Sequence, residues 1–524
     1  MSRTQTSKDT KGAPAGVVAA GDPHTAAAAA NVLADGGNAF DAVLAGLFTA
    51  CIAEPVLCSL GGGGFLLAQT AAGDRVLYDF FCQTPGRRLS ADALEFLPVQ
   101  VDFGTSRQEF HIGMGAMAVP GLVAGAHAVH QDLCTRPMAR LVEPAVALAR
   151  QGIALAPLQS FILAAVAPIF QWSAESRTLY DSPSAPEQTL RSGEILALPA
   201  LADLLEALAR EGPELFYRGD VAQAIAKANR DGGGAVSRED LANYRVLRRT
   251  PLARRFGDAE ILGNPAPSLG GPLLAFSLGL LQDSPATGHG EHLRQLLQAM
   301  RLTDRARQAS GLNELCDDAR VAALLSERFM ADYRARMPGR ASKIGGTTHI
   351  SVVDGMGNAA AMSVSNGEGC GHVLPTGSIM LNNMLGEEDL NPNGFFQWRP
   401  NSRITSMMSP TLVRHDDGRV LALGSGGSNR IRSAILQVLL NHLCLGQSLD
   451  AAVTAPRLHL EGDLLHIEHG HTAPALRHLL RDFPTHQIWP DRNFFFGGVH
   501  AAAFDPKTGA FTAAGDPRRG GSVA

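Results

Sequence analysis

The alternation of apolar and polar positions predicts strands near both ends of the chain, with helices concentrated between them. Short apolar runs at residues 17–20 and 65–69 are typical of buried strands. Residues 349–354 and 359–365 also have strand character, and the turn between them contains two glycines. These two segments are therefore expected to form a hairpin that begins at Thr347.

Helical spacing of apolar residues covers much of the remaining chain. Predicted helices span residues 24–35, 39–53, 141–151, 201–211, 431–443 and 449–455. An apolar strand at 420–423 leads into a glycine-rich loop, and the tail from 497 to 515 is predicted to form a second hairpin. The chain contains no internal repeat of fixed period.

The balance of charge excludes one large class of partners. Among 524 residues, 45 are Lys or Arg and 50 are Asp or Glu, which gives a net charge of -5. No basic face for nucleic acid is expected from this balance. The longest apolar stretch, residues 40–53, is too short to span a bilayer, so no membrane association is expected.

The N-terminal residues 1–15 are polar and are interpreted as a disordered leader. They lack the apolar core of a secretory signal, which indicates a cytoplasmic protein. A mis-assigned start codon would hide such a signal, and the protein would then be periplasmic. Residues 339–346, which are polar and rich in glycine, are expected to form an exposed loop.

Cysteine and histidine spacing gives no metal or disulfide pattern. The seven cysteines are scattered and never form a C-x-x-C pair, so buried free thiols are expected. Histidines 24, 349, 372, 459 and 500 lie far apart and lack ligand spacing, so core or surface roles are preferred. No metal, nucleotide, flavin or other cofactor is implied.

Thr347 follows two glycines and opens the predicted hairpin, which admits two interpretations. A Thr hydroxyl becomes an effective nucleophile when a base removes its proton, and the residue's own α-amino group can be that base. This requires cleavage of the bond between Gly346 and Thr347, and the resulting amine would have a pKa of about 7.7–8.0. The alternative is that Thr347 simply begins a strand, which these residues alone favour.

Three further segments carry candidate chemistry, each with a plainer structural reading. The loop 424–430 could hold an oxyanion through backbone N–H groups, or could be a tight strand-to-helix turn. Glycines 61–64 indicate close backbone packing rather than a phosphate loop, because the Lys-Ser/Thr of a P-loop is missing. Residues 387–389, Glu-Glu-Asp, could be catalytic carboxylates but are more typical of a solvated acidic turn.

Together, these motifs resemble the gamma-glutamyltranspeptidase family of N-terminal-nucleophile hydrolases, and the resemblance runs from about residue 16 to 524. The matching segments are ordered along most of the chain. They are residues 36–42, 61–65, 119–125, 216–219, 239–244, 347–354, 381–383, 408–411, 424–431, 455–457 and 516–518. Because so many motifs occur in order, the resemblance outweighs the plainer reading of Thr347.

The resemblance implies an α+β fold, a four-layer αββα sandwich, made by a precursor that cuts itself between Gly346 and Thr347. Residues 16–346 would become a large subunit and 347–524 a small one, intertwined in one unit. Thr347 would then be the nucleophile, with Ser365 as a supporting hydroxyl. Gly427 and Ser428 fall on the oxyanion-hole pair, where Ser428 replaces a glycine; a Ser backbone N–H can still donate.

The residues that the resemblance assigns to the substrate pocket depart from the family pattern. Two retained groups are Glu387, an acidic residue, and Ser406, the first of two serines. Phe81 replaces the Arg that binds the glutamyl carboxylate, which removes a bidentate clamp. The other assigned positions are Met407, which replaces the second serine, Asn366 and Asn383, together with Gly367 and Met384 where an Asn and a Gln are typical.

The sequence therefore predicts a gamma-glutamyltransferase-like enzyme, related to glutathione hydrolases, that cleaves a small-molecule amide through an acyl-enzyme. The acyl group would pass to water or to an amine. Because Phe81, Met384 and Met407 make the pocket more apolar, an acylase for a non-glutamyl acyl amide, like the cephalosporin acylases, is the first alternative. A non-catalytic, unprocessed binding protein is the second.

Overall fold

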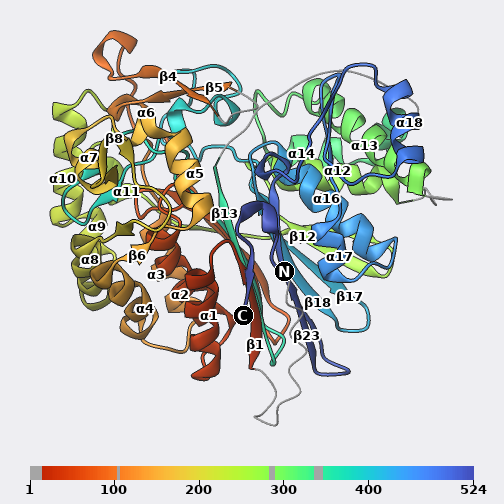
Figure 1. Ribbon diagram of the computed structural model, residues 1–524, viewed down its shortest axis with the longest axis horizontal. Helices are drawn as coiled ribbons and strands as arrows, with labels where there is room; N and C mark the ends of the chain where they lie inside the picture. The colour runs from red at the N-terminus through yellow and green to blue at the C-terminus, as the bar shows by residue number, and fades with distance from the viewer. Residues whose placement is uncertain (1–14, 103–106, 283–288, 335–345) are drawn as a thin grey trace.

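Two stacked β-sheets form the centre of the molecule, and helices cover both outer faces (Figure 1). The computed structural model describes residues 15–102, 107–282, 289–334 and 346–524. The leader 1–14 and most of the glycine-rich loop, residues 339–345, lie outside the described residues. Helices at the left of Figure 1 come from the first half of the chain, and those at the right mainly from the second.

The larger sheet has seven strands, and its order interleaves segments from distant parts of the chain. In spatial order these are β10 (Leu247–Arg249), β3 (Arg75–Phe80), β2 (Gly63–Gln69), β14 (Ala359–Ser365), β13 (Thr348–Asp354), β1 (Gly16–Ala20) and β24 (Ser522–Val523). The predicted hairpin is β13–β14, paired from Thr348 with Val364 to Val353 with Ala359. It sits in the middle of the sheet, between β2 and β1.

The second sheet has six strands. In spatial order these are β11 (Leu252–Phe256), β12 (Ala259–Gly263), β17 (Thr411–His415), β18 (Val420–Gly426), β22 (Gly498–Asp505) and β23 (Ala510–Ala514). β13 contacts β18 and β22 across the gap between the sheets. Every residue of β13 and of β18 is buried, as expected for strands that are covered on both faces.

Helices complete the outer layers. The larger sheet packs against α1 (Pro23–Ala34), α2 (Ala39–Ala53) and α3 (Leu122–Leu133), with α4 (Met138–Gln151) and α8 (Pro199–Glu211) behind them. The second sheet packs against α12 (Gly270–Leu281), α16 (Arg430–Leu443) and α17 (Leu449–Thr454), flanked by α13 (His289–Ala309) and α18 (Ala473–Asp482). The architecture is α+β with four layers in the order αββα, as predicted.

Smaller elements decorate this sandwich. Further helices are α5 (Pro157–Ala165), α6 (Ala167–Phe170), α7 (Ala174–Tyr180), α9 (Glu214–Tyr217), α10 (Asp220–Asp231), α11 (Arg238–Asn243), α14 (Asp318–Leu324) and α15 (Glu327–Arg334). Short strands pair as β4 (Leu97–Asp102) with β5 (Arg107–Ile112), β6 (Ile153–Ala154) with β9 (Ile195–Leu196), β7 (Asp181–Ser182) with β8 (Ala185–Thr189), β15 (Val373–Leu374) with β16 (Ile379–Met380), and β19 (Leu458–Glu461) with β20 (Leu464–Ile467) and β21 (His486–Ile488).

Local sequence explains the precise placement of α2, which packs behind β13. Asn38 is its N-cap, and its side chain accepts hydrogen bonds from the N–H groups of Phe40 and Asp41. In the other direction, the Asp41 carboxylate accepts a hydrogen bond from the Asn38 N–H. All fifteen residues of α2 are buried. The helix therefore has no polar stripe, and the capping box marks its start.

The glycine run at residues 61–64, which spans the start of β2, packs closely against neighbouring backbone, as predicted. A Cβ on Gly62 would overlap the Ser365 carbonyl oxygen, and one on Gly64 would overlap the Ser363 carbonyl oxygen. Both contacts are to β14, so the glycines bring β2 close to the second strand of the hairpin that begins at Thr347.

Two predictions need correction. The strand predicted at 420–423 continues to Gly426, because Gly424, Ser425 and Gly426 pair with β22. The cysteines are not uniformly buried: Cys134 and Cys316 are half-buried, and Cys444 is exposed.

No described helix is both long and apolar enough to cross a membrane. Among the described residues, His, Cys, Asp and Glu form no group of three that could hold a metal ion.

Candidate active site

Thr347 lies directly before β13, where the hairpin meets the end of β18. Its side chain is buried, and its hydroxyl donates a hydrogen bond of 2.7 Å to the carbonyl oxygen of Gly346. Gly426 packs against the Thr347 backbone, since a Cβ on Gly426 would overlap the Thr347 carbonyl oxygen. The peptide bond between Gly346 and Thr347 is thus held next to the glycine-rich loop.

Ser365, the last residue of β14, contacts the same carbonyl group. Its hydroxyl donates to the Gly346 carbonyl oxygen at 2.7 Å and accepts the Gly367 N–H at 3.0 Å. The hairpin register produces this contact, because Thr348 pairs with Val364 and so places Ser365 beside Thr347. Two hydroxyl groups therefore converge on the bond that the sequence predicts to be cut.

The loop after β18 carries the two predicted oxyanion donors. Gly427 has a φ of +120° and Ser428 a φ of +49°, so both lie in the left-handed half of conformational space. Within the described residues, neither N–H donates a hydrogen bond. Two unused N–H groups at the beginning of a helix can receive the negative oxygen of an acyl-transfer intermediate.

A small cavity adjoins Thr347. Its lining is Phe81, Gly346, Thr347, Ser365, Met384, Glu387, Asp389, Leu390, Ser406, Met407, Met408, Ser428 and Ile431. The volume is about 30 Å³, which admits water but no acyl group. Gly346 is itself part of the lining, so removing it is a way to enlarge the space in front of Thr347.

The cavity is largely apolar, and among the described residues no Lys or Arg lines it. Phe81 is buried and stacks on Phe65, with ring centroids 5.4 Å apart. Arg403 lies behind it but is engaged elsewhere: it pairs with Asp79 at 3.2 Å and donates to the Tyr244 hydroxyl and the Phe81 carbonyl. The position that the resemblance assigns to a carboxylate-binding Arg is thus occupied by the Phe81 ring.

Acidic residues form the polar wall of the cavity, which corrects the prediction of a solvated acidic turn. Only Glu388 is exposed; Glu387 and Asp389 face the cavity. Burial, followed by the charges of Glu368 and Asp389, raises the pKa of Glu387 well above its usual range. Burial also raises the pKa of Glu368, whose carboxyl group adjoins Gly346, to about 7, so these buried carboxyl groups carry protons near neutral pH.

The structure brings most of the predicted site residues together. Thr347, Ser365, Ser428, Glu387, Ser406, Phe81, Met407 and Gly346 all line the one cavity, and Gly427 adjoins Ser428. Asn383 lies behind the lining, where it accepts the Glu368 N–H at 3.0 Å. Asn366 is fully buried, and its side-chain amide has no hydrogen-bond partner among the described residues.

Sequence reasoning missed several residues of the site. These are Glu368, Asp389, Leu390, Met408 and Ile431. Asp389 belonged to the acidic triplet already singled out, and Ile431 follows the glycine loop directly, so both carried a signal. Glu368 was not singled out by any motif, because its proximity to Gly346 arises from the fold.

The histidines take structural positions. His349 is buried between the sheets, with its ring nitrogens 2.8 Å from the Ser363 hydroxyl and 2.9 Å from the Ser351 hydroxyl. Burial holds its pKa well below the usual range, so the ring is neutral. His500 is buried likewise, and its pKa is lowered to about 4.

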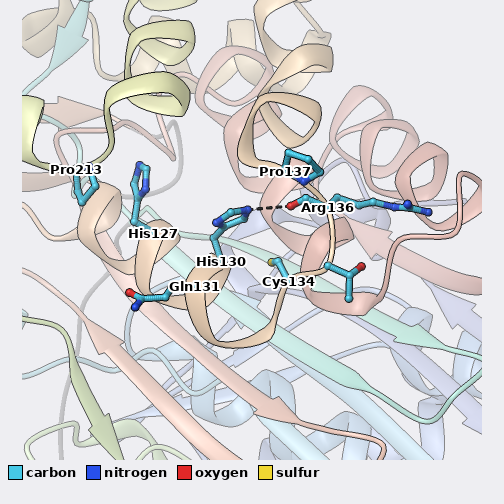
Figure 2. A pocket seen from close by; sticks show the side chains of 8 residues that line it. His127, His130, Gln131, Cys134, Arg136, Pro137 and Pro213 are labelled. Atoms are coloured by element: carbon cyan, nitrogen blue, oxygen red, sulfur yellow. Dashed lines mark hydrogen bonds between the residues drawn. The ribbon is translucent and has the colours of Figure 1, made fainter.

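A second, wider pocket of about 590 Å³ shares no lining residue with the cavity at Thr347, and Figure 2 shows the side chains that line it. Residues of α3 and the turn into α4 line it, together with Pro213. His130 is tied to the Arg136 carbonyl oxygen at 2.9 Å, and burial raises the pKa of the Cys134 thiol. None of the predicted site residues reaches this cavity, so its size does not make it the reactive centre.

The fold and the site together define a class. An αββα sandwich with a Thr at the start of a central strand is the arrangement of an N-terminal-nucleophile enzyme, one that cleaves acyl amide bonds. The chain belongs to the gamma-glutamyltranspeptidase family, whose sequence model matches residues 25–524.

Curated relatives and a solved structure agree with this assignment. The chain is 29% identical to the acylase ACY 1 proenzyme of Pseudomonas sp. (strain V22), over 94% of this chain and 90% of that protein. It is 29% identical to the glutathione hydrolase proenzyme of Escherichia coli (strain K12), over 88% and 84%. The cephalosporin acylase from Bacillus halodurans has the same fold, with a TM-score of 0.84, 22% identity, and coverage of 100% and 98%.

Proposed function

We propose that this precursor cuts itself between Gly346 and Thr347 and that Thr347 then acts as the catalytic nucleophile. The observation that carries the proposal is the convergence of the Thr347 and Ser365 hydroxyls on the Gly346 carbonyl oxygen, each at 2.7 Å. The names of both curated relatives describe proenzymes, which supports processing.

In the proposed self-cleavage, the Thr347 oxygen attacks the Gly346 carbonyl carbon, the hydroxyl proton passes to the peptide nitrogen, and that nitrogen leaves as an amine. This exchanges the peptide bond for an ester between Gly346 and the Thr347 side chain. Water then hydrolyses the ester, which frees a Gly346 carboxylate and the Thr347 hydroxyl. Ser365 polarises the carbonyl throughout, because its hydroxyl already donates to that oxygen.

In turnover, the new α-amino group of Thr347 removes the proton from its own hydroxyl. The hydroxyl oxygen attacks the acyl carbon of the substrate amide, and the N–H groups of Gly427 and Ser428 stabilise the negative oxygen. The amine leaves with the proton from the α-ammonium group. Water or a second amine then attacks the acyl-enzyme and releases the acyl group.

The preferred acyl group is one without a carboxylate. Phe81, Met384 and Met407 supply apolar surface, and among the described residues no Lys or Arg lines the cavity to pair with a carboxylate. Burying a carboxylate with no partner costs several kcal/mol, which corresponds to a preference of about 100-fold or more. A second candidate is γ-glutamyl transfer, which Glu387 favours because an acidic group there can bind an α-ammonium.

Intact mass spectrometry tests the cleavage. The wild-type protein is expected to yield two chains, one beginning at Thr347 and containing the last 178 of the 524 residues. Thr347→Ala is expected to stay a single chain of 55.2 kDa. A single chain in both would overturn the proposal and favour an unprocessed binding protein.

Substrate preference is tested by comparing phenylacetyl-p-nitroanilide with γ-glutamyl-p-nitroanilide. A kcat/KM at least about 100-fold higher for the phenylacetyl compound is expected. The opposite preference would show that γ-glutamyl recognition survives without the Arg clamp, and the second candidate would replace the first.

A further inference from the structure

Ser428 occupies a backbone conformation that normally requires glycine. Its φ of +49° is left-handed, and a residue with a Cβ pays about 1–2 kcal/mol to adopt it. The family pattern places a glycine at this position, which would carry no such cost. Something in this chain must therefore hold Ser428 in place.

Asp389 is the group that contacts it. The Ser428 hydroxyl donates a hydrogen bond to one carboxylate oxygen of Asp389. The other oxygen accepts a longer bond of 3.4 Å from the Asn429 side-chain amide. Asp389 sits in a short 3-10 turn, residues Glu388–Leu390, far from Ser428 in sequence but on the same cavity.

The orientation of the loop depends on this conformation. Returning Ser428 to a negative φ requires the peptide between Gly427 and Ser428 to turn over, and the Ser428 N–H would turn with it. The Gly427 carbonyl oxygen accepts a hydrogen bond of 3.0 Å from the Arg430 N–H, and the same rotation would break this bond. Helix hydrogen bonding and Asp389 thus favour the same orientation of the loop.

We propose that Asp389 is a positioning residue: by accepting the Ser428 hydroxyl, it holds the 427–428 peptide in the orientation that an oxyanion donor needs. A glycine at position 428 would adopt the left-handed conformation without support, whereas Ser428 is stabilised in it by its hydrogen bond to Asp389. The inference rests on the proposed function, because it concerns how the same acyl-transfer site is preorganised.

A double-mutant cycle separates this role from direct substrate binding. Asp389→Ala is expected to lower kcat by about 10- to 100-fold with a much smaller change in KM, as expected for a weakened oxyanion donor. In a Ser428→Gly background, the same Asp389→Ala change is expected to lower kcat by less than about threefold, because glycine needs no support. Rates are measured with the better of the two anilides and normalised to processed protein.

Two controls accompany the cycle. Asp389→Asn keeps an acceptor oxygen for Ser428 and is expected to lose less activity than Asp389→Ala. Glu388→Ala, on the exposed neighbouring residue, is expected to leave kcat within about twofold. An equal loss from Asp389→Ala in both backgrounds would overturn the proposal, since the carboxylate would then act on the substrate or the fold directly.

Crystal structures give a readout that does not need turnover. In Asp389→Ala the 427–428 peptide is expected to be turned over or to adopt two conformations, whereas in Asp389→Ala/Ser428→Gly it is expected to keep the wild-type orientation. An unchanged left-handed Ser428 in Asp389→Ala would overturn the inference. Failure of the proposed function would appear separately, as a wild-type protein that cleaves neither anilide.

Discussion

Gly367 is the residue on which the polar wall of the site is built. Its φ is +65°, and a Cβ there would overlap both Asn383 Oδ1 and Glu387 Oε1. The family pattern has an Asn at this position, whereas here the space is taken by Asn383 and Glu387. The absence of a side chain at Gly367 thus leaves room for Asn383 Oδ1 and Glu387 Oε1 beside the hairpin.

Gly367→Ala is expected to lower kcat/KM by about tenfold or more, because Glu387 and Asn383 must move to make room. Gly357→Ala is the matched control: Gly357 also has a positive φ, +90°, but a Cβ there would meet nothing within 4 Å. It should reduce stability by about 1 kcal/mol and leave activity unchanged. Equal activity in the two variants would show that the packing around Gly367 does not shape the site. Activity assays and thermal unfolding supply the data.

At the scale of elements, Glu54 connects two helices to the nucleophile strand. It is the C-cap of α2, and its buried carboxyl accepts hydrogen bonds from Thr25 of α1 at 3.0 Å and from Thr348 of β13 at 2.5 Å. Burial, followed by the charge of Asp22, raises its pKa to about 7. Arg519 and the two hydroxyl donors lower the pKa but do not offset these effects.

This raised pKa predicts a pH-dependent contribution to stability. The folded protein keeps the Glu54 proton up to about pH 7, whereas the unfolded chain releases it near the ordinary pKa of a Glu carboxyl, 4.5. Between these values the folded state binds more protons, so the stability that Glu54 contributes falls as the pH rises. Glu54→Gln removes the titrating group and is therefore expected to stabilise the protein at pH 8 by about 1–3 kcal/mol relative to its parent.

The measurement is urea unfolding at pH 5 and pH 8 in a Thr347→Ala background, which keeps the chain in one piece. The advantage of Glu54→Gln should be present at pH 8 and small or absent at pH 5. Glu187→Gln, on the exposed strand β8, is the control for adding an amide. A gain of the same size at both pH values would mean that the titration of Glu54 does not cause it.

The bounds of an element were predictable from the sequence where local residues determine them, and not where a distant part of the chain does. Helix α2 was predicted at its observed bounds, since Asn38 and Asp41 mark its start within the local sequence. Strand β18 was predicted three residues too short because its last residues have low strand propensity and are held by pairing with β22. Asp389 was discounted for a similar reason, as its partner Ser428 is distant in sequence.

At the scale of the molecule, the predicted cut divides both sheets. In the seven-stranded sheet, β2 pairs with β14 and β1 with β13, so each pair joins the two future chains. In the six-stranded sheet, β12 and β17 form the corresponding pair. Cleavage before Thr347 would therefore leave two chains that share one core and cannot separate without unfolding.

After processing, the two chains are expected to elute together from a size-exclusion column, at the volume of the uncut Thr347→Ala protein. They should separate only in denaturant, because separation exposes the strands on both sides of each seam. Two peaks in native buffer from the processed protein would contradict the shared core. The composition of each peak is read by mass spectrometry.

The division of both sheets also changes the order of the folding reaction. The precursor finds its native structure as a single polymer, at a rate independent of concentration. Once cut, an unfolded molecule becomes two polymers that must meet again, so refolding becomes second order and competes with aggregation. The working lifetime of a processed protein would then be governed by its unfolding rate rather than by its equilibrium stability, because an unfolded molecule could refold as a single chain only before the cut.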